Sequence, residues 1–244
     1  MKNLYLFIGL LLTFNNLTAQ KKVTENTKSA GIEDVFVHAK FANNIEIKHW
    51  NKNEIAIEAT VNIDDNTHND YFKLIADQIG KTYTIKSDYG DYFKKYRSYS
   101  YHTSHKEGED EKCDCENQFS NIVNYVIYVP QKMNLKVKSI SGSVLADSYN
   151  GFLELDLISG NIDIKKHSAK MRLKTISGDI DLFITDATFE AKTLTGGIYS
   201  DLDIDFDQKR KKNHGHQKVK ATINKGTASL ELSTISGDIF LRKS

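Results

Sequence analysis

The residue types best suited to metal binding gather in one stretch of the sequence, between residues 102 and 115. His102 and His105 are followed by Cys113 and Cys115, with acidic residues between them. Imidazoles and thiolates together are ligands for zinc or copper. A single Cys-x-Cys pair supplies only two thiolates, so an acidic loop without metal is the alternative. In an oxidising compartment the two thiols could instead pair with each other or between chains.

Tyrosines interleaved with basic residues lie just upstream of this stretch. The tyrosines that we take as candidate ligand contacts are Tyr92, Tyr96 and Tyr99, and the basic residues among them are Lys94, Lys95 and Arg97. Tyrosine presents a large apolar ring with a polar end, which suits stacking on a sugar. The alternative is that these rings cover a sheet face or lie in a loop.

A row of carboxylates precedes a basic run near residue 208. The acidic residues Asp201, Asp203, Asp205 and Asp207 alternate with apolar ones, which predicts one strand face of hard oxygen ligands suited to Ca²⁺. A charged outer face that discourages edge pairing is the alternative. The basic run, residues 208–216, is typical of a solvated loop, although it could contact acidic polymers.

No catalytic motif accompanies these candidates. Asp64, Asn66, His68 and Asp70 resemble an EF-hand loop only weakly, because Asn69 replaces the required Gly and Ile75 the required Glu. The chain contains no Gly-x-Ser-x-Gly elbow, His-Glu-x-x-His helix or P-loop. We therefore predict that the protein is not an enzyme and binds no cofactor.

Internal repetition indicates how the chain positions these residues. Ser-Gly or Thr-Gly pairs recur at a constant interval at Ser141, Ser159, Ser177 and Thr195, and a fifth copy at Ser236 follows after a longer interval. Apolar residues alternate at period two on both sides of each glycine, which predicts two short strands joined at a bend. A strand–bend–strand unit repeated at fixed length predicts stacked coils. The fold class is therefore all-β, a single-chain β-helix or β-solenoid with 18-residue coils.

Charges test whether successive coils stack in register. One outward position alternates in sign through Lys136, Glu154, Arg172 and Glu190. The next outward position reads Lys138, Asp156, Lys174 and Lys192, and its last step is a like-charge pair. Opposite charges on neighbouring strands stabilise pairing and like charges weaken it, so the pattern favours stacking with one mismatch.

The chain upstream of the repeats is also rich in strand signals and continues into them without a linker. We predict one β-domain over residues 32–244, with regular coils over 131–244, after a short N-terminal extension at 20–31. Loop insertions are expected at about 88–120 and 205–218.

Residues 1–19 have the pattern of a secretory signal peptide. Lys2 precedes an apolar run from Leu4 to Phe14, and Ala19 ends a small-residue cleavage site, so cleavage is predicted between Ala19 and Gln20. The run is too short to span a bilayer, and no transmembrane segment is expected in the mature chain. Lys and Arg total 33 against 32 Asp and Glu, which gives no drive toward nucleic acid. We expect an extracytoplasmic protein, periplasmic or secreted.

The repeats and their surroundings resemble the bacterial putative adhesin family over residues 32–244. The segments that carry the resemblance are Val129-Pro130, Thr175-Ile176-Ser177-Gly178-Asp179-Ile180 and Thr234-Ile235-Ser236-Gly237-Asp238-Ile239. The resemblance implies a β-helix-like solenoid in an envelope or secreted protein, and the family has no assigned biochemical function. The two charged insertions depart from the family pattern.

These observations favour a non-enzymatic, envelope-associated or secreted β-solenoid with a binding, adhesin-like or structural role. Its expected partners are a surface glycan, an envelope protein, or further copies of itself at the solenoid ends. The last coil is expected to leave a free strand edge, blunted by Arg242 and Lys243. Two alternatives are a β-helix enzyme acting on polysaccharide through the Asp201–Asp207 face and an extracytoplasmic metal or stress sensor.

Overall fold

The all-β prediction is confirmed, and the strands follow the alternation of apolar and polar residues. The computed structural model describes residues 20–97, 120–203 and 217–243. In strand β8 (Phe152–Ser159) the side chains of Leu153, Leu155 and Leu157 are completely buried, and the residues between them face outward. Successive side chains of a strand point to opposite faces, so each strand contributes one face to the core.

In the described residues of the N-terminal half, 20–97 and 120–130, the chain forms six strands and two short helices. They are β1 (Lys21–Lys28), β2 (Asp34–Trp50), β3 (Glu54–Ile63), the 3-10 helix η1 (Asn69–Tyr71), β4 (Lys73–Ile79), β5 (Thr82–Asp88), α1 (Tyr92–Arg97) and β6 (Asn121–Pro130). Strand β1 pairs antiparallel with β3. The segment expected as an N-terminal extension therefore carries a strand of the sheet, which begins earlier than residue 32.

The C-terminal half consists of the repeated units. Its strands are β7 (Asn134–Ala146), β8, β9 (Ile162–Ile164), β10 (Lys170–Ser177), β11 (Ile180–Ile184), β12 (Ala187–Thr195), β13 (Ile198–Ser200), β14 (Gln217–Ile223), β15 (Ala228–Ser236) and β16 (Ile239–Lys243). From β8 onward each Ser-Gly or Thr-Gly unit enters its corner through one strand and leaves through the next, as the spacing predicts, whereas β7 runs through its corner at Gly142 as a single strand.

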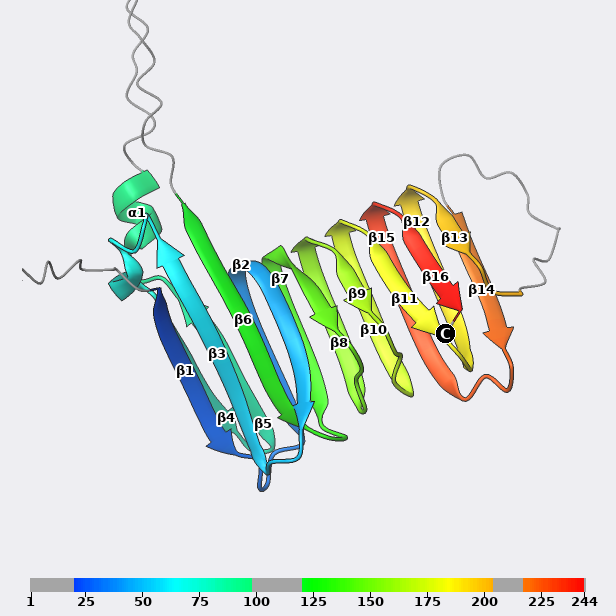
Figure 1. The fold of residues 1–244 in the computed structure, drawn as a ribbon, viewed down its shortest axis with the longest axis horizontal. Coiled ribbons are helices and arrows are strands. Elements are labelled where there is room, and N and C mark those ends of the chain that lie inside the picture. Colours follow the sequence, from blue (N-terminus) through cyan, green and yellow to red (C-terminus); the bar gives the residue numbers. More distant parts are fainter. Residues whose placement is uncertain (1–19, 98–119, 204–216, 244) are drawn as a thin grey trace, which may run out of the picture.

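Two layers of strands face each other across the core, because the long strands β2 and β7 change partners along their length. Residues 34–38 of β2 pair with β5, whereas residues 44–50 pair with β6. The first layer has the order β4-β5-β2-β7-β8-β10-β15-β12-β14, and the second has the order β1-β3-β6-β2-β7-β9-β11-β16-β13. In Figure 1 the layers lie one behind the other.

Glycine is required where the chain turns from one layer to the other. The corner glycines stack in the order Gly142, Gly160, Gly178, Gly237 and Gly196, all with positive φ. A Cβ on Gly178 would lie 2.2 Å from the carbonyl oxygen of Gly160. The next residue adds a side-chain ladder: the N–H of Asp179 donates to Oδ1 of Asn161 (2.9 Å), and that of Asp238 donates to Oδ1 of Asp179 (2.8 Å).

The units do not stack in the order in which they occur in the chain. An 18-residue register relates β7 to β8 and β8 to β10, where Leu153 pairs with Leu135 and with Met171. Beyond β10 this register ends, because Met171 pairs with Leu230 of β15, and Leu230 pairs in turn with Phe189 of β12. The same order holds in the second layer, where β16 lies between β11 and β13. The expectation of successive 18-residue coils throughout the repeats is therefore wrong at this point.

This insertion also overturns the expected free edge at the C-terminal coil. Strand β16 pairs with β11 on one side and with β13 on the other, so it is not an edge strand that Arg242 and Lys243 could blunt. The first layer instead ends at β14, which runs antiparallel to β12. Within the part of the chain that the structure describes, no helix has the length and hydrophobicity needed to cross a membrane.

Candidate functional site

The structure gives the predicted ligand-contact tyrosines very different surroundings. Tyr92 lies in α1 with only 1% of its surface exposed, so the expectation that its ring contacts a ligand is wrong. Its ring packs against the rings of His68, Phe93 and Tyr96. Tyr96 is half-buried in the same cluster. Apolar ring area favoured burial, and the aromatic cluster closes the N-terminal end of the core.

Several other predicted residues lie outside the described part of the chain. They are the signal peptide over residues 1–19, Tyr99, the candidate metal ligands His102, His105, Cys113 and Cys115, the basic run at 208–216, and Asp205 and Asp207. Asp201 and Asp203 are described and do not lie in a strand. Asp201 accepts a hydrogen bond from the N–H of Lys243 (2.5 Å). Among the described residues, no group of three or more His, Cys, Asp or Glu could hold a metal ion.

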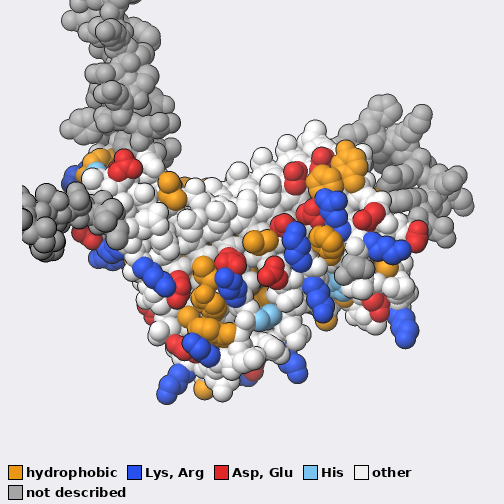
Figure 2. Space-filling view, viewed as in Figure 1, with side chains coloured by type: hydrophobic (Ala, Val, Ile, Leu, Met, Phe, Trp, Pro, Cys, Tyr) orange, Lys and Arg blue, Asp and Glu red, His pale blue; other side chains and the backbone are white. Residues whose placement is uncertain are grey.

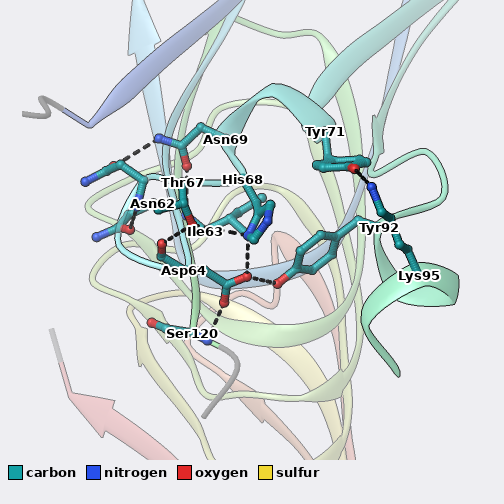
Figure 3. Close-up of polar contacts among 11 residues, drawn as sticks. Asn62, Ile63, Asp64, Thr67, His68, Asn69, Tyr71, Tyr92, Lys95 and Ser120 are labelled. Carbon is teal, nitrogen blue, oxygen red and sulfur yellow. Dashed lines mark hydrogen bonds and ion pairs between the residues drawn. The ribbon is translucent and has the colours of Figure 1, made fainter. Parts of the chain in front are cut away.

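A polar network around Asp64 was not predicted from the sequence (Figure 3). Oδ2 of Asp64 accepts a hydrogen bond from the hydroxyl of Tyr92 (2.7 Å) and lies 2.8 Å from Nδ1 of His68. Since a carboxylate only accepts, that histidine nitrogen carries the proton. Oδ1 accepts the backbone N–H of Ser120 (3.1 Å). The carboxylate is thus satisfied by three donors.

The loop that carries Asp64 adopts an unusual backbone. Asp64, Asp65 and Asn66 have φ values of 47°, 51° and 71°, in the left-handed region that Asp and Asn tolerate better than most residues. The side chain of Asn69 supports the turn, because its Oδ1 accepts the N–H of Ile63 (2.8 Å). These Asp and Asn residues produced the weak EF-hand resemblance, and their role in the structure is to form this turn.

The electrostatics of the network favour a structural role. Burial, reinforced by the hydrogen bond to Asp64, raises the pKa of Tyr92 far above its usual range. Its hydroxyl therefore stays protonated and donates. Nζ of Lys95 donates to the hydroxyl of Tyr71 (3.0 Å) beside the cluster. Asp64 contacts helix α1 on one side and Ser120 on the other, which joins the chain before residue 98 to the chain after residue 119.

The outer side of the first layer carries a groove that follows strand β15, which we call the β15 groove. Its volume is about 440 Å³. The solvent-facing residues that line it are Arg172, Lys174, Thr188, Glu190, Lys192, Lys220, Ser229, Glu231 and Ser233. The groove exists because β15 places the short side chains of Ser229 and Ser233 between long side chains on β10 and β12.

Positive charge is in excess along one wall of the β15 groove. The carboxylate of Glu190 forms ion pairs with Lys192 and Lys220, and Nζ of Lys218 lies 3.3 Å from the same carboxylate. Hydrogen bonds from Lys192, then Lys220, lower the pKa of Glu190 to about 2. One carboxylate cannot neutralise the ammonium groups of both Lys192 and Lys220, which line the groove with it. On the opposite wall Nε of Arg172 donates to Glu231 (2.9 Å).

A second groove of about 440 Å³ lies beside the first, over β2, β7 and β8. Phe36 and Phe152 line it together with Lys136 and Lys138. Lys170 of β10 covers the ring of Phe152, with Nζ 5.1 Å from the ring centre. Glu154 joins the two grooves, because it pairs with Lys136 on one side and with Arg172 on the other. The outer side of the first layer thus combines aromatic and ionic surfaces in one band.

An exposed aliphatic ridge borders this band near the corners. Its members are stacked in strand order, and they are Ile140, Ile158, Ile176, Ile235 and Leu194, each between 36% and 51% exposed. They are the apolar residues directly before each Ser-Gly or Thr-Gly pair. Their place next to a buried position, as with Leu157 and Ile158, shows that they face outward. The sequence motif alone did not distinguish them from core residues.

Charges of both signs are mixed on the face drawn in Figure 2, where acidic, basic and hydrophobic side chains are interspersed. The excess of lysines in the β15 groove is a departure from this mixing.

Comparison with known proteins agrees with the fold. Residues 128–242, a little under half of the chain, match the family described as Toastrack DUF4097. No curated protein matches the sequence significantly. A solved structure of a putative cell adhesion protein from Clostridium sporogenes is 11% identical, with a TM-score of 0.54, and the match covers 92% of this chain and 100% of that chain. At this identity the likeness concerns the fold alone.

A putative adhesin from Bacteroides fragilis is a more distant structural match. It is 9% identical, with a TM-score of 0.36, and the match covers 93% of this chain and 99% of that chain.

Proposed function

We propose that this protein is a non-enzymatic, adhesin-like binding protein that holds an extended glycan on the outer side of its first layer. The observation that carries the proposal is the pair of adjoining grooves on that side, with partly exposed aromatic rings at Phe36 and Phe152 and ionic groups between them. Binding sites combine apolar or aromatic surface with a few placed polar groups. A groove open along a sheet suits a polymer.

The state of the acidic residues supports binding over catalysis. Asp64 is satisfied by three donors, and Glu190 is surrounded by three lysines that hold its pKa at about 2. A general acid or base works best with a pKa near the operating pH. The carboxylate of Glu190 does not have that property, and the carboxylate of Asp64 is already occupied by its three donors.

The cellular setting is part of the same proposal. Residues 1–19 would direct the chain out of the cytoplasm and be cleaved between Ala19 and Gln20. A surface glycan or an envelope protein would then be its partner. The likeness in fold to the putative cell adhesion protein of Clostridium sporogenes is consistent with this setting.

The test is a screen of glycans and cell-wall polymers with the mature protein, residues 20–244, with and without EDTA. We expect binding that survives EDTA and is weakened by Phe152→Ala. The matched control is Phe183→Ala, because Phe183 is also half-buried, lies in the second layer, and has Lys165 over its ring at 5.4 Å.

Three outcomes would contradict the proposal. One is the absence of binding to any polymer. Another is that Phe183→Ala loses binding whereas Phe152→Ala keeps it. The third is the appearance of new reducing ends in the bound glycan, which would indicate an enzyme.

A further inference from the structure

Three lysines and a serine form an outward row across the β15 groove. Ser233 of β15 pairs in register with Lys174 of β10 on one side and with Lys192 of β12 on the other. Lys218 of β14 follows Lys192 in the same row. Neighbouring strands lie about 4.8 Å apart, so the Cα atoms of the two flanking lysines are separated by about 9.6 Å.

No carboxylate stands in this part of the row, all four positions of which the structure describes. The nearest carboxylate of Lys174 is Asp156, on the strand beyond, at 3.8 Å. Lys192 and Lys218 share Glu190 of the adjacent row with Lys220. Like charges that face each other across a sheet reduce stability. Within its row, Ser233 is therefore flanked by two cationic side chains, Lys174 and Lys192, and by no carboxylate.

The insertion of β15 creates this arrangement. Under an unbroken 18-residue register Lys192 would stack directly on Lys174. With β15 between them, the two lysine side chains line opposite walls of a groove with a short hydroxyl side chain at its floor. That spacing leaves room for one anionic group, which would receive two charge-assisted hydrogen bonds from the lysines and one from the serine.

We propose that the β15 groove binds the anionic groups of an acidic polysaccharide, with a carboxylate or sulfate held between Lys174 and Lys192 over Ser233. This inference rests on the proposed function and names its ligand class. Further along the groove, Ser229 and Thr188 offer hydroxyls to the sugar rings. Arg172 is bound to Glu231 and Glu154 and shapes the wall.

The test measures binding of the mature protein to polygalacturonate, dextran sulfate and neutral dextran at increasing salt. The first two probes separate carboxylate from sulfate, and binding to either one supports the inference. The test variant is Lys174→Gln/Lys192→Gln. The control, Lys48→Gln/Lys165→Gln, removes the same charge from similarly half-exposed lysines outside the groove.

We expect the wild type to bind an anionic polymer more tightly than dextran, with an affinity that falls as salt rises. Lys174→Gln/Lys192→Gln should lose at least about tenfold in affinity through the lost charge contacts, whereas the control variant keeps wild-type affinity. Lys174→Arg/Lys192→Arg, which retains both charges, should restore most of the binding. Circular dichroism of each variant verifies the fold.

The outcomes separate this inference from the proposed function. Equal losses in the groove and control variants would show that only net charge matters and would overturn the inference. Binding of neutral glycans alone would overturn the inference and leave the proposed function standing. If no polymer of any kind binds, both fail.

Discussion

The N-terminal end and the stack of repeated units are stabilised in different ways. At the N-terminal end, single side chains make contacts that occur once, such as those of Asp64 with Tyr92 and Ser120. In the stack, the same contacts recur from corner to corner beyond Gly142: each glycine lies against a glycine carbonyl, and from Asn161 onward an Asn or Asp side chain accepts the next N–H. Unique contacts identify a position, whereas repeated contacts allow one unit to replace another. This is why the fifth unit can lie between the third and the fourth.

A corner glycine should produce the largest effect. Gly178→Ala forces a Cβ to within 2.2 Å of the carbonyl of Gly160, at a φ of +150°. We expect the free energy of unfolding to fall by about 3 kcal/mol or more, from overpacking and backbone strain together. Gly31→Ala is the control, because Gly31 has a φ of +80° with nothing near its Cβ position, and should cost about 1–2 kcal/mol.

Urea denaturation of both variants gives the comparison. Equal losses would mean that the stacked corners are no tighter than an isolated turn, and would remove the distinction between the two regions.

The unique contacts of the N-terminal end should have an intermediate effect. Tyr92→Phe leaves the Asp64 carboxylate with one donor fewer, at an expected cost of about 1–3 kcal/mol. Tyr199→Phe is the control, since that ring is more than half exposed and stacks on Phe240. Hydrogen exchange should show faster opening around η1, α1 and the start of β6 in Tyr92→Phe. Opening spread evenly over the stack would contradict a local role for the network.

Low pH should lower the stability of the end of the first layer, where β12 pairs with β14, by a smaller amount. The lysines lower the pKa of Glu190 from 4.5 to about 2, so between these values the unfolded chain binds the proton and the folded chain does not. The stabilisation is present above about pH 4.5 and is lost as the pH falls toward 2. Because the lysines are largely exposed, about 1 kcal/mol is expected.

Glu190→Gln should therefore lower stability at pH 7 and leave it nearly unchanged at pH 2, as measured by urea denaturation at both values. Asp203→Asn, at a fully exposed side chain, is the control. A constant difference between Glu190→Gln and the wild type at all pH values would show that the carboxylate does not act through its charge.

The aliphatic ridge should give the smallest effect on stability. Ile158→Thr changes a side chain that is 50% exposed, and we expect a change within about 0.5 kcal/mol. The neighbouring Leu157→Ala empties a completely buried position and should cost about 2–5 kcal/mol. A large loss in Ile158→Thr would show that the ridge packs against part of the protein in solution.

Much of the local architecture could be predicted from the sequence. The alternation around Leu153 and Ile162 predicts their burial, and the Ser-Gly spacing predicts the corners, because the direction of a side chain and the need for positive φ depend on adjacent residues. The candidate sites could be predicted less well from the sequence. The residue type of Tyr92 and its basic neighbours suggested a ligand contact, but its ring is buried in the core. The Asp64 network could not be predicted because its partners lie far apart in the chain.

The stacking order was decided by the tertiary structure alone. Units with the same apolar pattern are locally interchangeable, so nothing within a single repeat distinguishes β12 from β15 as the neighbour of β10. In the observed order Arg172 meets Glu231 across β10 and β15, and β14 covers the outer edge of β12. One feature of the sequence indicated this order: Lys174 and Lys192 would be a like-charge pair in an unbroken 18-residue register. Its meaning became visible only when Ser233 was seen to lie between them.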